Sequence, residues 1–323
     1  MGDLMPRSNH TALGCLLAIV SSLGVPSMAA QVKNANPNYA AVREFGRIEW
    51  HGDTATLVAG SSRPLDMAAL TLSTCLGISV SSEDPQYHYL GDLLDVTAPQ
   101  WSAQHPESHV YQGRPGKVEI TFPVLPDGSP SDTGKLLTEI AQQVNDQQPY
   151  AFKVHVRTLR DGTFYSFVPT RTRDEKGVLT NVQAYMDTSI TIPEQTSRIE
   201  SLASAMASSV SEASGSHFDC CQAIVMGWPW GGKSVTYQAN GTPAREVLED
   251  LMAKIEEEES YSLRCEPLGK RFCFINVHSV LKRVHTPSGE CTALGYESHE
   301  NRGGDIRERP AIYTVLAAIA PPR

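Results

Sequence analysis

The order of helices and strands is clearest in four neighbouring segments, TGKLLTEIAQQVN (133–145), FKVHVRTL (152–159), RDG (160–162) and TFYSFVP (163–169). The first segment places Leu137, Ile140, Ala141 and Val144 on one side of a helix, with Ser131 or Asp132 as its cap. The later segments alternate apolar and polar residues around an Asp-Gly turn, which predicts a β-hairpin. A predicted strand over 117–124 precedes them. The order is therefore strand, helix, strand, turn, strand.

The same order recurs later in the chain. A predicted strand over 234–238 precedes a helix that begins at Pro243, and a hairpin over 261–277 follows. Two further helices, over 64–76 and 193–211, each follow a polar turn and precede a strand; for the first, Ser62 is the expected cap and Gly77 the stop. We therefore predict an α+β fold of two tandem modules, each built of small β-sheets packed by two helices. The modules span 55–170 and 186–280, with 171–185 as the linker.

The N-terminus is typical of a secretory signal. Arg7 precedes an apolar run over 11–25, and small residues end at Ala29, the predicted cleavage point. The run is shorter than the roughly 20 residues that a membrane-spanning helix needs. We expect a secreted or periplasmic protein without a membrane span. In this protein, we expect residues 30–54 to form an N-terminal segment and residues 281–323 to form an irregular C-terminal tail.

Charge and cysteine content fit this prediction. The net charge of −9 argues against nucleic acid as a partner, because phosphate binding requires clustered basic residues. Removal of the signal with Cys15 leaves six cysteines, an even number that makes disulfides plausible. Cys265 and Cys273 face each other if their hairpin loop is the three residues 268–270. A four-residue loop from Pro267 would put the two cysteines on opposite faces of the sheet. Both loop lengths stay open, and with them the question of whether the two cysteines are bonded.

Three groups of residues suggest a functional site, but each lacks a feature that the site requires. GWPWGGKS (227–234) spells a phosphate-binding loop, but a β-rich segment follows it where a helix is required. Asp132-Thr133-Gly134 copies an aspartic-protease triplet, yet it opens a helix and has no second copy. His217, Asp219, Cys220 and Cys221 lack the paired spacing of a metal site. We predict no catalytic residue, no metal and no cofactor.

The loop over 83–97 is the candidate ligand site. It interleaves carboxylates with aromatic residues, and calcium or a sugar could use such a set; the alternative is a solvated connecting loop. The candidate residues are Asp84, Tyr87, His88, Tyr89, Asp92 and Asp95.

Two resemblances involve the same region. SRPL (62–65), SEDPQY (82–87) and GDLLDVT (91–97) resemble a group of exported bacterial proteins of unassigned activity. The unit over 58–82, echoed by the helix from Pro243 and its hairpin, is similar to the short N-terminal domain of secretins and TonB-dependent receptors. The second resemblance implies a periplasmic interaction role.

We therefore expect an exported, non-enzymatic binding or interaction protein whose partner is a protein or a cell-envelope ligand. The alternative is a secreted hydrolase that uses residues around Asp84, His88 and Asp92.

Overall fold

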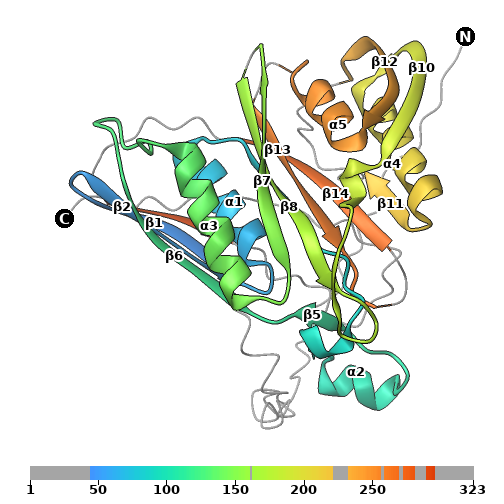
Figure 1. The fold of residues 1–323 in the computed structure, drawn as a ribbon, viewed down its shortest axis with the longest axis horizontal. Coiled ribbons are helices and arrows are strands. Elements are labelled where there is room, and N and C mark those ends of the chain that lie inside the picture. Colours follow the sequence, from blue (N-terminus) through green and yellow to red (C-terminus); the bar gives the residue numbers. More distant parts are fainter. Residues whose placement is uncertain are drawn as a thin grey trace, which may run out of the picture. The chain divides into compact units, whose positions relative to one another are not determined.

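The computed structural model describes residues 44–160, 162–220, 232–255, 258–268, 272–280 and 289–294. Helices and strands are mixed along these residues, and the chain has an α+β fold (Figure 1). The signal predicted over 1–29 lies outside the described residues. None of the described helices is long and apolar enough to cross a membrane.

One antiparallel sheet has the strand order β15–β1–β2–β6. Its strands are β1 (Phe45–His51), β2 (Thr54–Ser61), β6 (Gly116–Pro123) and β15 (Gly289–Leu294). Helices α1 (Pro64–Leu76) and α3 (Thr133–Gln147) pack against it. Leu72 and Ile140 from the helices meet Ile48 and Leu57 from the strands in the first hydrophobic core.

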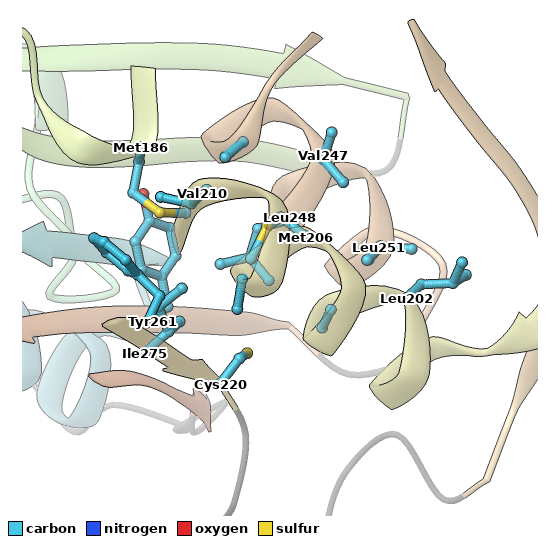
Figure 2. Close-up of a cluster of buried hydrophobic side chains, with 14 of the residues drawn as sticks. Met186, Leu202, Met206, Val210, Cys220, Val247, Leu248, Leu251, Tyr261 and Ile275 are labelled. Carbon is cyan, nitrogen blue, oxygen red and sulfur yellow. The ribbon is translucent and has the colours of Figure 1, made fainter. Parts of the chain in front are cut away.

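A second core forms around a two-stranded antiparallel sheet of β10 (Ser189–Arg198) and β12 (Ser234–Pro243). Helices α4 (Ile199–Ser214) and α5 (Ala244–Met252) belong to it. Figure 2 shows this cluster, with Tyr261 and Ile275 toward one end, Leu202 of α4 toward the other, and Met206 of α4 and Leu248 of α5 between them.

A larger sheet joins the two halves of the chain in the order β11–β14–β13–β3–β8–β7, and β9 (Leu179–Asn181) pairs with β8. The strands are β3 (Val80–Glu83), β7 (Ala151–Leu159), β8 (Gly162–Arg173), β11 (His217–Cys220), β13 (Glu259–Cys265) and β14 (Phe272–Ser279). The hairpins β7–β8 and β13–β14 are antiparallel. β3 runs parallel to both β8 and β13, with Ser82 opposite Ser262 at the junction.

The two cores lie on opposite faces of this central sheet. Because side chains alternate along a strand, Tyr261 and Leu263 of β13 enter the second core while Arg264 bonds to Asp66 of α1. Likewise, Val154 of β7 packs against the first core.

The connecting segments contain short elements. β4 (Leu93–Asp95) pairs with β5 (Tyr111–Gly113), and α2 (Pro99–Gln104) lies between them in the sequence. Two 3-10 turns cover Leu90–Asp92 and Tyr185–Asp187.

Local signals set the ends of two helices. Asp132 caps α3 by accepting a hydrogen bond from the Lys135 amide at 2.9 Å, as expected. Gly77 ends α1 with φ of 66°, a conformation that favours glycine. The cap predicted for α1 was wrong, because Arg63 rather than Ser62 holds that position and makes no side-chain cap bond.

Three predicted boundaries also differ. The helix predicted over 193–211 begins at Ile199, because 193–198 belongs to β10 and pairs with β12. The predicted linker 171–185 contains the end of β8 and all of β9. Within the tail expected to be irregular, 289–294 forms β15 beside β1; the remainder lies outside the described residues.

Two disulfides join pairs of described cysteines. Cys265 is directly opposite Cys273 and bonded to it, which confirms the pairing that a three-residue loop requires. Cys75 of α1 is bonded to Cys291 of β15, a pairing the sequence did not indicate. Structural disulfides are typical of proteins in oxidising compartments.

Candidate functional site

The predicted site residues lie in one continuous segment after β3, but the structure distributes them among separate contacts. Asp84 and Tyr87 are buried, and Asp92 is buried further along the loop. His88, Tyr89 and Asp95 are partly exposed. No hydrogen bond joins any two of Asp84, His88 and Asp92 in the described part of the chain. Each of the three side chains is instead bonded to a different partner: Asp84 to Arg63, His88 to Gln86, and Asp92 to Arg173.

Asp84 is a structural anchor. Its Oδ2 accepts hydrogen bonds from Arg63 Nε at 2.7 Å and from the Cys265 amide at 2.9 Å. The Tyr87 hydroxyl donates to its Oδ1 at 3.3 Å. Burial, followed by the nearby Asp84 carboxylate, raises the pKa of Tyr87 well above its ordinary value, so the hydroxyl stays a donor. This group joins the loop to the start of α1 and to the end of β13.

A small cavity lies beside this anchor. It measures about 30 Å³ and is lined in part by Arg63, Asp66, Asp84, Tyr87 and Tyr150. A cavity needs roughly 10–15 Å³ to hold one water molecule, so this space accommodates about two. It is too small for an organic ligand.

Asp92 and Tyr89 share one partner, Arg173 at the end of β8. Arg173 Nη1 donates to Asp92 Oδ1 at 3.0 Å, and its guanidinium lies 5.8 Å from the centre of the Tyr89 ring. Burial raises the pKa of Asp92, and Arg173 opposes that shift. The contacts fasten the loop to the central sheet.

Asp95 organises a local turn. Its Oδ1 accepts from the Thr97 amide at 2.8 Å and from the Thr97 hydroxyl, and its Oδ2 contacts His109 Nδ1 at 2.8 Å. Burial would raise the pKa of Asp95, but these hydrogen bonds hold it below its ordinary value. The carboxylate is therefore engaged within the chain.

His88 is the one predicted residue that lines a larger cleft. The cleft measures about 330 Å³ and lies between the loop after β3, the segment 183–188 and the C-terminal end of α4. Its polar lining residues are Gln86, His88, Gln183, Tyr185, Thr188, Ser214 and Ser216. This volume falls at the small end of the range for ligand sites, about 300–1,000 Å³.

A buried cluster of acids and arginines, missed by the sequence reasoning, lies on the face of the central sheet that carries the second core. Arg245 of α5 donates to both oxygens of Glu83, from Nε at 2.6 Å and from Nη2 at 3.0 Å, and it also contacts Asp187. The Tyr261 hydroxyl donates to Glu83 at 2.7 Å. Glu83 and Arg245 are 162 residues apart, and no local pattern marks either as buried.

A second arginine extends this cluster. Arg157 of β7 donates to Asp250 at 2.7 Å and to the Glu246 carbonyl at 2.8 Å, and it lies 3.4 Å from Glu249. Burial raises the pKa of Glu249 to about 7, although Arg157 and Arg245 oppose that shift. The cluster joins α5 to β3 and β7, and its side chains are turned to one another. It is therefore a structural contact.

The described residues contain no group of three His, Cys, Asp or Glu side chains that could hold a metal. Cys220 is disulfide-bonded, and Cys221 lies outside the described residues. Most of the phosphate-loop match also lies outside them, and Ser234, its last residue, starts strand β12. Comparisons with protein-family models, curated proteins and solved structures found no match.

Proposed function

We propose that the chain is an exported, non-enzymatic interaction protein, built from two copies of one unit, that binds an extended polypeptide along strand β7. The observation that carries the proposal is that no strand of the described chain pairs with the outer edge of β7. In the second unit, the corresponding edge is filled by another strand.

The two units have matching elements and matching pairings. The first unit consists of β2, α1, β3, β6, α3, β7 and β8, and the second of β10, α4, β11, β12, α5, β13 and β14. β2 pairs antiparallel with β6 as β10 does with β12. β3 lies parallel to β8 as β11 does to β14. Each unit ends in an antiparallel hairpin, so β7 corresponds to β13.

The outer edge of β13, which corresponds to the outer edge of β7, pairs with a strand. β3 lies along it as a parallel strand, and the Leu263 carbonyl accepts a hydrogen bond from the Asp84 amide at 2.9 Å. Along the corresponding edge of β7, the described chain places no strand. A polypeptide in extended conformation can add to such an edge through main-chain hydrogen bonds.

The backbone groups that face this edge can be identified. The amide and carbonyl of Phe152 bond to the side chain of Asn145 on α3, at 2.8 and 3.0 Å, and therefore point away from β8. Because strand geometry alternates, Val154, Val156 and Thr158 also point their backbone groups outward. The Val156 side chain is 52 % exposed, so the edge combines outward peptide groups with an apolar contact.

The remaining evidence concerns compartment and chemistry. The signal predicted at the N-terminus and the two disulfides support export. The acids of the candidate loop are engaged with Arg63, Arg173 and Thr97, which supports a non-enzymatic role.

The test uses short random peptides displayed on phage and selected against the purified mature chain. Enriched peptides should slow hydrogen exchange at Val154, Val156 and Thr158. Val156→Pro removes one outward amide without removing a β7–β8 hydrogen bond, and proline is tolerated at such edge positions. The change should weaken peptide binding about tenfold, because it removes one hydrogen bond and distorts its neighbours.

Val156→Thr is the matched control, because it keeps the amide and the β-branched shape. Its affinity for the peptides should match that of the wild type. Enrichment of no peptide would overturn the proposal. Protection elsewhere in the chain, or equal binding by the proline variant, would overturn it as well.

A further inference from the structure

We propose that the cleft of about 330 Å³ between 86–88, 183–188 and the end of α4 binds a small neutral saccharide. This site is separate from β7, and the inference does not depend on the strand-addition proposal.

The cleft joins segments that lie far apart in the sequence. Gln86 and His88 come from the loop after β3, and Gln86 Nε2 donates to the Gln183 carbonyl at 3.3 Å. Ser216 follows the C-terminal end of α4, and its hydroxyl donates to the Tyr185 hydroxyl at 3.2 Å. Ser216 is 3 % exposed and Tyr185 is partly exposed, so this hydroxyl pair extends from the buried wall of the cleft toward its open side. Ligand sites are often found where such separate segments meet.

The charge of the lining selects the ligand class. The described residues that line the cleft include no lysine, arginine, aspartate or glutamate. An anion would meet no cationic partner there, and the last carbonyls of α4 add partial negative charge around Ser214. A cation would meet no carboxylate. A neutral ligand avoids both unpaired charges.

The hydrogen-bonding groups favour hydroxyls. Each amide, hydroxyl and imidazole side chain in the lining can both donate and accept, and the hydroxyls of a sugar do the same. The terminal carbonyls of α4 can accept from a hydroxyl donor. A saccharide therefore satisfies the groups around it, whereas an apolar ligand of the same size would leave them without partners.

The experiment follows backbone amide shifts of the mature chain by NMR during titration with single sugars. The neutral probes are glucose, galactose, N-acetylglucosamine and maltose, and the charged ones are glucuronate and glucosamine. At least one neutral sugar should give saturable shifts at 86–88, 183–188 and 213–216. Both charged sugars should bind at least about tenfold more weakly, because the cleft offers their charges no partner.

Thr188→Arg places a long cationic side chain in the cleft and should abolish these shifts. Thr180→Arg makes the same change on β9, outside the lining, and should leave them intact. Ser214→Ala removes one hydroxyl with little change of volume and should weaken binding without loss of folding. The inference is overturned if no neutral sugar binds, if the shifts map elsewhere, if charged sugars bind equally well, or if Thr188→Arg leaves binding unchanged.

Discussion

Replacing Glu249 by glutamine should make the protein more stable at alkaline pH. The Glu249 side chain is fully buried, and its Oε1 has no hydrogen-bond partner. The surrounding cluster contains more acids than bases. Its acids are Glu83, Asp187, Glu246, Glu249 and Asp250, and its cations are Arg157 and Arg245. The acids outnumber the cations by three, so the countercharge around Glu249 is incomplete.

The pKa of Glu249 gives the sign and size of the effect. Burial raises this pKa from 4.5 to about 7, so the folded protein holds the proton more tightly than the unfolded chain does. The folded state loses this advantage as pH rises from about 4.5 to about 7. The wild type should lose about 3 kcal/mol from this group over that interval, since one pKa unit corresponds to about 1.4 kcal/mol.

Urea unfolding of the oxidised protein at pH 5 and pH 8.5 measures the difference. Glu249→Gln should lie within about 1 kcal/mol of the wild type at pH 5, where both side chains are neutral. It should be more stable by about 2–3 kcal/mol at pH 8.5, where only the wild type carries the buried charge. Glu139→Gln on the exposed side of α3 is the control for simple loss of negative charge. Parallel stability profiles of wild type and Glu249→Gln would refute the reasoning.

Two further changes test what holds the fold together. Arg245→Met should lower the free energy of unfolding by about 3–5 kcal/mol, because it leaves the Glu83 carboxylate buried without its cation. Adding Glu83→Gln should restore much of that loss, and equal instability of the single and double variants in urea would contradict the argument. Replacing Cys75 and Cys291 by serine should cost about 5 kcal/mol, against about 2.5 kcal/mol for the bridge within the β13–β14 hairpin, because loop entropy grows with loop length. Urea unfolding of the two double variants measures this difference, and equal losses would argue against the entropic account.

The sequence predicts the elements whose signals are local. α1 occupies the predicted range from Pro64 to Leu76, because helical periodicity and a glycine stop agree. The register of the β13–β14 hairpin also follows from the spacing of Cys265 and Cys273 once the loop length is known. In each case the residues that determine the structure are close to one another in the sequence.

Elements that depend on distant partners are not predictable in this way. The helix predicted over 193–211 includes 193–198, but pairing with β12 places these residues in β10. β15 exists as a strand beside β1 and is bonded through Cys291 to α1. Tertiary pairing overrides local preference at both places.

The same limit applies to the candidate site. Asp84 and Asp92 resemble available ligand groups in the sequence, yet Arg63 and Arg173 engage them in the folded chain. The loop sequence does not encode the position of either arginine. His88 alone among the predicted residues reaches the larger cleft, whose other walls come from 183–188 and 213–216.

The bond between Cys75 and Cys291 changes how the protein would respond to mechanical tension. It spans 216 positions along the chain and makes them one covalent ring that includes the central sheet and α3 to α5. A pull applied at the two termini would pass through the sulfur atoms and could not stretch the residues inside the ring. About 750 Å of contour length would remain hidden until the bond was reduced. If both ends of the protein were tethered outside the cytoplasm, tension could extend only the chain before Cys75 and after Cys291.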